Sequence, residues 1–275
     1  MLNKKEERYI ENELQQITSY LRRDSGGPGL NQFSELTKHI YVSSWVGASN
    51  REALTDYRIN RIICLSAEKK PRSLMDTYQI NHIDHKVLPL IDSPDENISK
   101  YLELVYDAIH QSVMNDENIL VHCHAGSSLS AAFVIYYYLK RFYMTNFGKD
   151  IAEDFALVDP ANFNLINIIK FVKEYRSCIE PNAEFIHQLL IAETFIKRRL
   201  KEFLDKQLEA EKKYKRERAI KEAEKRKKER EREKIPKKKS SKKIESSESE
   251  GEDLDNFSDE FSDEFSESEE FSSGE

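Results

Sequence analysis

Cys123 stands in a stretch whose residue types could carry out nucleophilic chemistry: residues 119–132 read I-L-V-H-C-H-A-G-S-S-L-S-A-A. The apolar residues 119–121 indicate the end of a buried strand, and the mostly apolar run 128–138 predicts a helix. A loop of small residues between a strand and a helix N-terminus can cradle an anion, because its N–H groups turn inward and the helix dipole adds positive potential. That potential favours a nucleophilic thiolate at Cys123. The sequence therefore predicts phosphoryl transfer onto sulfur.

The same stretch resembles a known signature. His122, Cys123, Gly126, Ser127 and Ser130 look like the H-C-x-x-G-x-x-R-S/T motif of cysteine-dependent protein tyrosine phosphatases, in the dual-specificity branch. The resemblance covers residues 38–195. One position departs from the motif, because Leu129 stands where the family has Arg.

The resemblance implies roles for individual residues. Cys123 would attack phosphorus and form a phosphocysteine, and Ser130 would stabilise the departing thiolate when that intermediate is hydrolysed. Asp92, in L-P-L-I-D-S-P-D-E-N-I, matches the general acid that protonates the leaving oxygen, with Asp95 as its local rival. The phosphate-binding loop would consist of His122, His124, Ala125, Gly126, Ser127, Ser128 and Leu129.

Leu129 decides how much chemistry we expect. An Arg grips two phosphoryl oxygens with a planar fork, whereas Leu offers no donor. Loss of a phosphate-clamping Arg costs phosphoryl-transfer enzymes ~10³–10⁵ in rate. Lys69, Lys70, Arg72 and His124 are the neighbours that could supply charge in its place. Two functions follow: a protein phosphatase acting on phosphotyrosine or phosphoserine/threonine with strongly reduced turnover, or a pseudophosphatase that binds a phosphoprotein or another partner without hydrolysing it.

A metal site is the alternative reading of His122 and His124. Adjacent strand residues point to opposite faces, and no further Cys/His cluster completes a set of four ligands, so we expect neither a metal nor a cofactor. The other cysteines, Cys64 and Cys178, are far apart and form no disulfide framework, and Cys64 is expected in the core. This pattern indicates a reduced, intracellular protein, cytoplasmic or nuclear. No run of 18 apolar residues predicts a membrane span.

The elements that must position these residues alternate between strands and helices. Strands are expected at 39–42, 61–65, 85–90 and 118–121, and helices at 49–57, 98–114, 129–145, 150–157 and 162–177. This order predicts an α/β fold with a central, mostly parallel sheet flanked by helices. Pro181, Asn182, Phe185 and Gln188 resemble the start of the family's last helix, P-N-x-x-F-x-x-Q-L.

The chain is expected to have four parts. Residues 1–37 hold an amphipathic helix, over 3–23, and a linker; that helix either packs on the domain or pairs with itself, and packing is preferred. Residues 38–196 form the phosphatase-like domain. Residues 197–243 carry 23 Lys and Arg against 10 Asp and Glu. Residues 244–275 carry 14 Asp and Glu and no Lys or Arg.

The two charged parts have different expectations. Residues 181–234 predict one long helix, and its end is held by i,i+4 ion pairs because apolar residues are scarce after Leu208. K-I-P-K-K-K-S-S-K-K resembles a nuclear-import patch, but interleaved Glu residues make nucleic-acid binding the less favoured interpretation. The acidic tail predicts disorder, and Ser247, Ser249 and Ser266 suit acid-directed kinases.

Overall fold

The computed structural model describes residues 2–23, 33–68, 74, 76, 78–79, 82–144 and 163–233. By its internal contacts the chain divides into two units, residues 1–216 and 217–275, and the second is described only by residues 217–233. The expected helix at 150–157, the import patch and the acidic tail lie outside the described residues.

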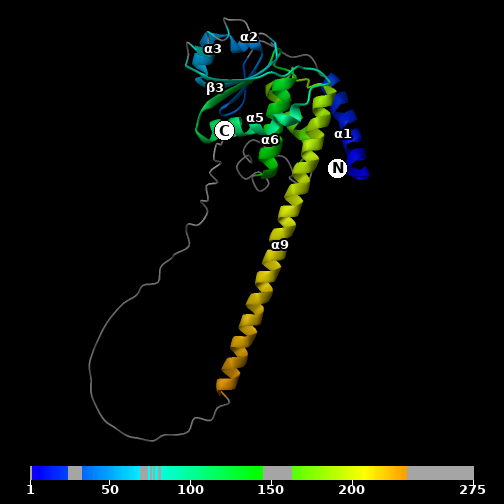
Figure 1. The fold of residues 1–275 in the computed structure, drawn as a ribbon, viewed down its shortest axis with the longest axis vertical. Coiled ribbons are helices and arrows are strands. Elements are labelled where there is room, and N and C mark those ends of the chain that lie inside the picture. The colour runs from blue at the N-terminus through cyan, green and yellow to red at the C-terminus, as the bar shows by residue number, and fades with distance from the viewer. Residues whose placement is uncertain are drawn as a thin grey trace, which may run out of the picture. The chain divides into compact units, whose positions relative to one another are not determined.

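A five-stranded sheet in the order β1-β2-β5-β3-β4 forms the centre of the first unit (Figure 1). Its strands are β1 Ser34–Thr37, β2 Ile40–Ser43, β3 Ile59–Leu65, β4 Asp84–Leu88 and β5 Asn118–His122. The pairs β2–β5, β5–β3 and β3–β4 are parallel, and β1 pairs antiparallel with β2. The expected α/β fold with a mostly parallel sheet is confirmed.

Both faces of this sheet are buried, as a parallel sheet requires. Successive strand residues face opposite sides: Ile119 and Val121 of β5 belong to the larger apolar cluster, whereas Leu120 between them belongs to the smaller one. The smaller cluster also holds Leu54 of α3 (Arg51–Asp56) and Tyr78. Alternation therefore explains why a continuous apolar run forms the central strand.

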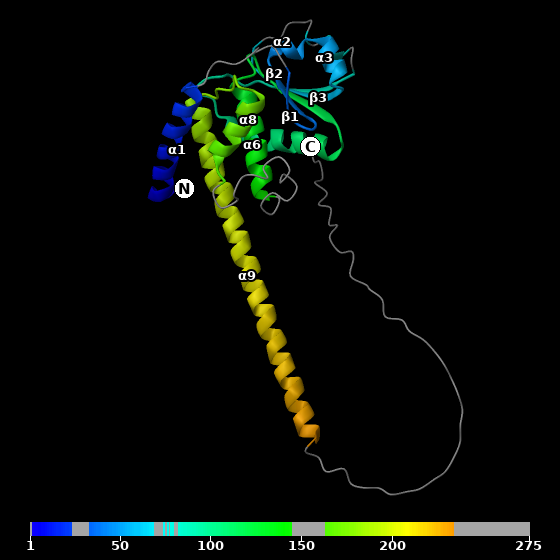
Figure 2. The same cartoon turned by 180° about the vertical axis from the view of Figure 1, so that it is seen from behind.

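The larger cluster is covered by helices: α5 Leu102–Met114, α6 Leu129–Met144, α8 Leu165–Tyr175 and the first part of α9 Ala183–Glu233. A 3-10 turn, η1 Ile98–Lys100, precedes α5. Figure 2 shows α6 and α8 beside the start of α9. The expected single long helix after Pro181 is present, and from Lys201 onward each of its described side chains is exposed.

The N-terminal helix α1, Lys4–Arg23, packs on the domain. Ile10, Ile17 and Leu21 are buried in the larger cluster, and Glu6 pairs with Arg198 of α9 at 2.7 Å. Figures 1 and 2 both show α1 beside α9. Of the two arrangements considered for this helix, packing is the one in the structure.

Two local features differ from the sequence expectation. The sheet contains β1, ahead of Lys38, which the sequence did not indicate. The helix expected over 49–57 is α3, which begins only at Arg51 after its cap Asn50, whose Oδ1 accepts from the Ala53 N–H at 3.1 Å. Ser49 instead ends α2, Trp45–Ala48, and donates its hydroxyl to the Trp45 carbonyl.

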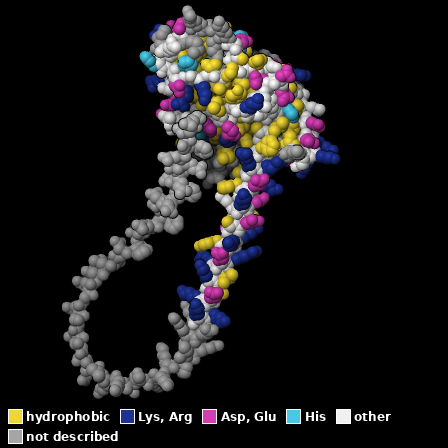
Figure 3. All heavy atoms as spheres, in the orientation of Figure 1, with side chains coloured by type: hydrophobic (Ala, Val, Ile, Leu, Met, Phe, Trp, Pro, Cys, Tyr) yellow, Lys and Arg dark blue, Asp and Glu magenta, His cyan; other side chains and the backbone are white. Residues whose placement is uncertain are grey.

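Along the later part of α9, positive and negative side chains alternate (Figure 3). Lys215 pairs with Glu211 at 2.5 Å, and Arg218 pairs with Glu222 at 3.2 Å, each across one helical turn. These are the i,i+4 ion pairs that the sequence predicts, and each stabilises a helix by only ~0.2–0.5 kcal/mol. None of the helices in the described ranges has the length of apolar sequence that a membrane crossing needs.

Candidate active site

Cys123 directly follows β5, at the edge where the carboxyl ends of the parallel strands meet. Open α/β sheets bind ligands at this edge. The Cys123 Sγ accepts a hydrogen bond from the Gly126 N–H at 3.1 Å and lies 3.3 Å from the Ser130 Oγ. The sulfur is therefore turned into its own loop, although the residue is only 3% exposed.

The loop backbone is held from behind by residues 176–182, which connect α8 to α9. The Gly126 carbonyl accepts from the Arg176 Nε at 2.7 Å, and the Ser127 carbonyl accepts from the Glu180 N–H at 2.9 Å. In a trans peptide the N–H points opposite to the carbonyl, and the described chain has no cis peptide. The N–H groups of Ser127 and Ser128 are therefore directed away from this connection.

The first turn of α6 completes the loop. The Ala132 N–H bonds to the Ser128 carbonyl at 2.8 Å, so the helix begins within the loop and its positive end lies there. Ser128 is buried and Ala125 is half-buried. Inward N–H groups at a helix N-terminus suit a small oxyanion.

Gly126 is the residue that allows this close packing. Its φ is +73°, in the left-handed region, and an added Cβ would lie 2.5 Å from the Ser43 carbonyl oxygen and 2.6 Å from the Arg176 guanidinium. Only glycine adopts such a conformation without a steric cost. The close approach explains why the motif needs glycine here.

His122 points into the protein rather than into the loop. The Tyr78 hydroxyl lies 2.8 Å from its Nε2, and its Nδ1 lies 3.3 Å from the Cys123 carbonyl. Burial, and secondarily the nearby Cys64, raises the pKa of Tyr78, so its hydroxyl keeps its proton beside Nε2. The Cys64 Sγ lies 3.9 Å from Nδ1, so His122 is held by contacts on both ring nitrogens directly beside Cys123.

Asp92 reaches the loop from the segment after β4. Its Oδ1 accepts from the Ser128 Oγ and from the Asn182 Nδ2, both at 2.9 Å. Asp95, its rival in the sequence, has its backbone N–H bonded to the Ser93 hydroxyl. The structure thus brings Asp92 to the loop. Both donors bond Oδ1, so Oδ2 of Asp92 makes no hydrogen bond within the part of the chain that the structure describes.

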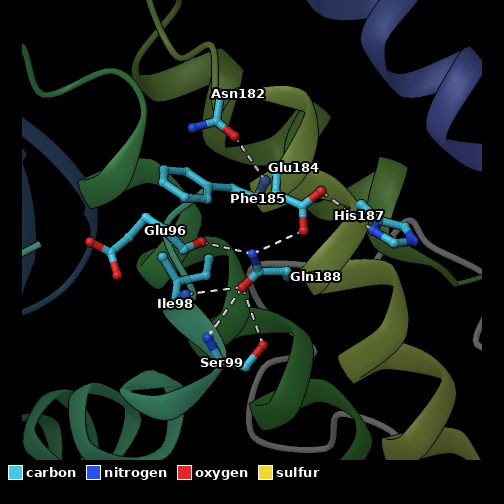
Figure 4. Close-up of polar contacts among 8 residues, drawn as sticks. All are labelled: Glu96, Ile98, Ser99, Asn182, Glu184, Phe185, His187 and Gln188. Carbon is cyan, nitrogen blue, oxygen red and sulfur yellow. Dashed lines mark hydrogen bonds and ion pairs between the residues drawn. The ribbon is translucent and has the colours of Figure 1, made fainter. Parts of the chain in front are cut away.

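Gln188 of α9 anchors the segment that carries Asp92 (Figure 4). Its Oε1 accepts from the N–H groups of Ile98 and Ser99 at 3.0 and 3.3 Å, and its Nε2 donates to the Glu96 carbonyl at 2.9 Å. The start of α9 therefore holds the acid-bearing segment through Gln188 and the acid itself through Asn182.

Leu129, the first residue of α6, is 3% exposed and belongs to the larger apolar cluster. The position of the motif's Arg is therefore occupied by packed hydrocarbon. His124 does not take its place: its side chain is 63% exposed, pairs with Glu68 at 2.9 Å and stacks on Trp45. Lys69, Lys70 and Arg72 lie outside the described residues.

Sequence reasoning missed Arg176 altogether. It is buried at the end of α8 and contacts a loop that precedes it by 50 residues. The local pattern around it contains no sign of this contact. The sequence indicates Asn182 and Gln188 only through the resemblance of the last helix. The structure shows that Asn182 bonds to Asp92 and that Gln188 bonds to the segment that follows Asp92.

Comparison with known proteins relates part of this chain to a known family. Residues 40–147 match the family model described as the dual specificity phosphatase catalytic domain. The chain is 30% identical over 164 residues to the mouse serine/threonine/tyrosine-interacting protein, a match covering 59% of this chain and 65% of the relative. It is 28% identical over 163 residues to dual specificity protein phosphatase 18 of Pongo abelii, covering 59% and 73%.

Two further matches are to a Drosophila relative and to a solved structure. The match to the Drosophila melanogaster dual specificity protein phosphatase MPK-4 is 25% identical and spans 39% of that protein. The solved structure of the human tyrosine phosphatase-like serine/threonine/tyrosine-interacting protein is 26% identical, with a TM-score of 0.45, and covers 60% of this chain and 97% of that one. The chain thus spans less than two thirds of the mouse and Drosophila relatives.

Proposed function

Because this chain belongs to the dual-specificity phosphatase family, we propose that its Cys123 loop binds phosphorylated side chains of proteins and dephosphorylates them at a strongly reduced rate. The observation that carries the proposal is the geometry around one sulfur. The Cys123 Sγ accepts a hydrogen bond from the Gly126 N–H and lies beside the Ser130 hydroxyl. Asp92 accepts a hydrogen bond from Ser128 of the same loop.

The reaction would proceed in two steps. The Cys123 thiolate attacks phosphorus, an S–P bond forms, the P–O bond breaks, and protonated Asp92 gives its proton to the leaving oxygen. A water molecule then attacks the phosphocysteine and gives a proton to Asp92, while the Ser130 hydroxyl donates to the departing thiolate. Phosphate leaves, and the starting enzyme is restored.

Leu129 is the reason for proposing a low rate. The backbone N–H groups and the helix dipole remain to bind the phosphoryl oxygens, but no planar guanidinium at residue 129 follows the charge as it moves. A missing phosphate clamp costs ~10³–10⁵ in rate in other phosphoryl-transfer enzymes. We therefore expect binding to persist better than turnover.

A second function has its own supporting observation. Leu129 is not merely a missing donor, because its side chain is packed in the apolar cluster. A protein that binds partners without hydrolysing them needs no group at this position to stabilise the moving charge of a transition state. The mouse relative is named an interacting protein and others are named phosphatases, so relatives with both kinds of name exist. Non-catalytic binding is the alternative proposal.

The rate at which the protein hydrolyses an aryl phosphate distinguishes slow catalysis from binding without hydrolysis. The wild type should be slow but faster than Cys123→Ser, and Leu129→Arg should gain ~10³-fold or more. Leu129→Met, which keeps an apolar side chain of similar volume, is the matched control and should behave like the wild type. Wild-type turnover equal to that of Cys123→Ser would remove the enzymatic function and leave binding.

The gain in Leu129→Arg must depend on Cys123. The double variant with Cys123→Ser should return to background, which excludes a contaminating phosphatase. We also expect Leu129→Arg to lose about 1–3 kcal/mol of unfolding free energy, because it removes a buried leucine side chain. No gain in a folded Leu129→Arg variant would mean that the remaining groups are not assembled for catalysis.

A further inference from the structure

We propose that Arg176 is a positioning residue that supplies, from behind the loop, part of the oxyanion affinity that an Arg at residue 129 would otherwise supply. This inference rests on the proposed function of the same loop. Arg176 follows α8 directly, and its backbone N–H bonds to the Val172 carbonyl, so the end of the helix fixes its place.

The first argument is geometric. Residues 126, 127 and 128 are each held by the segment 176–182: Gly126 O by Arg176 Nε, Ser127 O by the Glu180 N–H, and the Ser128 Oγ by the Asn182 N–H at 3.3 Å. Because the carbonyls of Gly126 and Ser127 point toward this segment, the N–H groups of the same two peptides, at Ser127 and Ser128, point away from it. The segment thus orients the donors of the loop before any anion arrives.

The second argument is electrostatic. A hydrogen bond from a charged donor is stronger than a neutral one, and it polarises the peptide group that accepts it. The Arg176 guanidinium bonds the Gly126 carbonyl, so the N–H on the other side of that peptide, at Ser127, becomes a stronger donor. Burial lowers the pKa of Arg176, and the charges of Cys178 and Cys123 oppose that shift. The guanidinium stays charged because no protein environment readily deprotonates arginine.

The third argument concerns alternatives. Lys173 and Arg176 are the buried cations among the residues that the structure describes. Lys173 donates to the Leu21 carbonyl of α1 at 3.4 Å and so belongs to the packing of that helix. Arg176 also donates from Nη1 to the Ser34 Oγ at 3.2 Å, which ties strand β1 to the same residue. Of the two, Arg176 is the one that contacts the loop.

Tungstate binding to the full chain, measured by calorimetry, tests the inference without requiring any turnover. Arg176→Gln should bind tungstate at least about tenfold more weakly than the wild type, because it keeps a donor but loses the charge. Arg176→Lys keeps the positive charge and N–H donors on its ammonium group, so its tungstate affinity should stay within about threefold of the wild type. Arg61→Gln is the matched control. Arg61 lies near the start of β3, at the end of the sheet away from the loop, and pairs with Asp84 of β4, so this variant should bind tungstate like the wild type.

The outcomes are distinct. A folded Arg176→Gln that binds like Arg61→Gln overturns the inference and leaves the proposed function standing. Arg176→Lys that loses as much as Arg176→Gln overturns it too, because the effect would then be one of shape and not of charge. Arg176→Lys also keeps the test decisive where Arg176→Gln does not fold, since a folded lysine variant weakened tenfold contradicts the inference. No binding by the wild type would contradict the anion loop itself, and both proposals with it.

Discussion

At the scale of single residues, the site depends on side chains whose positions are fixed by hydrogen bonds. Cys123 has its sulfur fixed by one N–H, and Asp92 has one oxygen fixed by two donors. Leu129 shows the converse, because a residue at the right position in the motif contributes no donor. Gly126 links the nucleophile to the segment behind the loop, because its N–H donates to the Cys123 Sγ and its carbonyl accepts from the Arg176 Nε.

Gly126→Ala should therefore disturb stability and anion binding together. The left-handed conformation alone costs a non-glycine residue about 1–3 kcal/mol, and the added methyl group would meet the Ser43 carbonyl at 2.5 Å. Urea unfolding should show at least this loss, and tungstate affinity should fall. Ser127→Ala, at the next loop position, is the control and should change stability by less than about 0.5 kcal/mol. Equal stability of the two variants would show that the loop relaxes freely.

At the scale of elements, the start of α9 organises the site. Asn182 caps the helix by accepting from the Phe185 N–H at 2.9 Å and also donates to Asp92. Six residues further along the chain, Gln188 is buried against the turn η1. The helix thus holds the acid-bearing segment at two points, and both contacts join residues about 90 positions apart in the chain.

Gln188→Met should release that segment while keeping the volume of the side chain. The buried N–H of Ile98 would lose its acceptor, and a buried donor left unpaired costs about 1–3 kcal/mol. The exposed Ser99 N–H keeps the Asn97 Oδ1 at 3.1 Å as an acceptor. Hydrogen exchange should therefore become faster at the Ile98 amide, whereas His187→Ala, a neighbouring and more exposed change on α9, should leave its protection unchanged. Protection equal in both variants would contradict the anchoring role of Gln188.

The same scale shows what the sequence could predict. The four strands and the helices over 98–114, 129–145 and 162–177 follow from local periodicity, and the structure contains each with ends shifted by a few residues. Strand β1 gave no such signal, because Leu36 is its one buried residue. Contacts between distant segments, such as Arg176 with Gly126, are set by tertiary packing. Leu129 also needed the structure, because a leucine beside a loop can line a pocket or fill a core.

At the scale of the first unit, α1 is attached through a buried carboxylate. Glu193 of α9 is fully buried, and its oxygens contact the Tyr9 hydroxyl of α1, the Tyr143 hydroxyl of α6 and the Leu165 N–H of α8. Lys197 pairs with it at 2.8 Å. Four helices thus meet at one acidic group, and a further carboxylate brought near it must feel its charge.

Glu13 of α1 is that further carboxylate. Burial raises its pKa, the charge of Glu193 raises it further, and Lys197 opposes both. A Glu whose pKa is higher in the folded state than in the unfolded state binds its proton more tightly when folded, so its ionised form costs stability at neutral pH. That cost disappears as the pH falls through the raised folded value. Glu13→Gln should therefore stabilise the protein at pH 7, by less than about 1 kcal/mol because the group is partly exposed.

Urea unfolding at a series of pH values measures this effect. The stability difference between Glu13→Gln and the wild type should be largest at pH 7 and shrink toward acid, because the wild type then becomes protonated at the same position. Glu11→Gln is the control, since Glu11 lies on the exposed face of α1. A gain of the same size in both variants at every pH would indicate a general effect of net charge. A gain confined to Glu13→Gln at neutral pH would place α1 against Glu193 in solution.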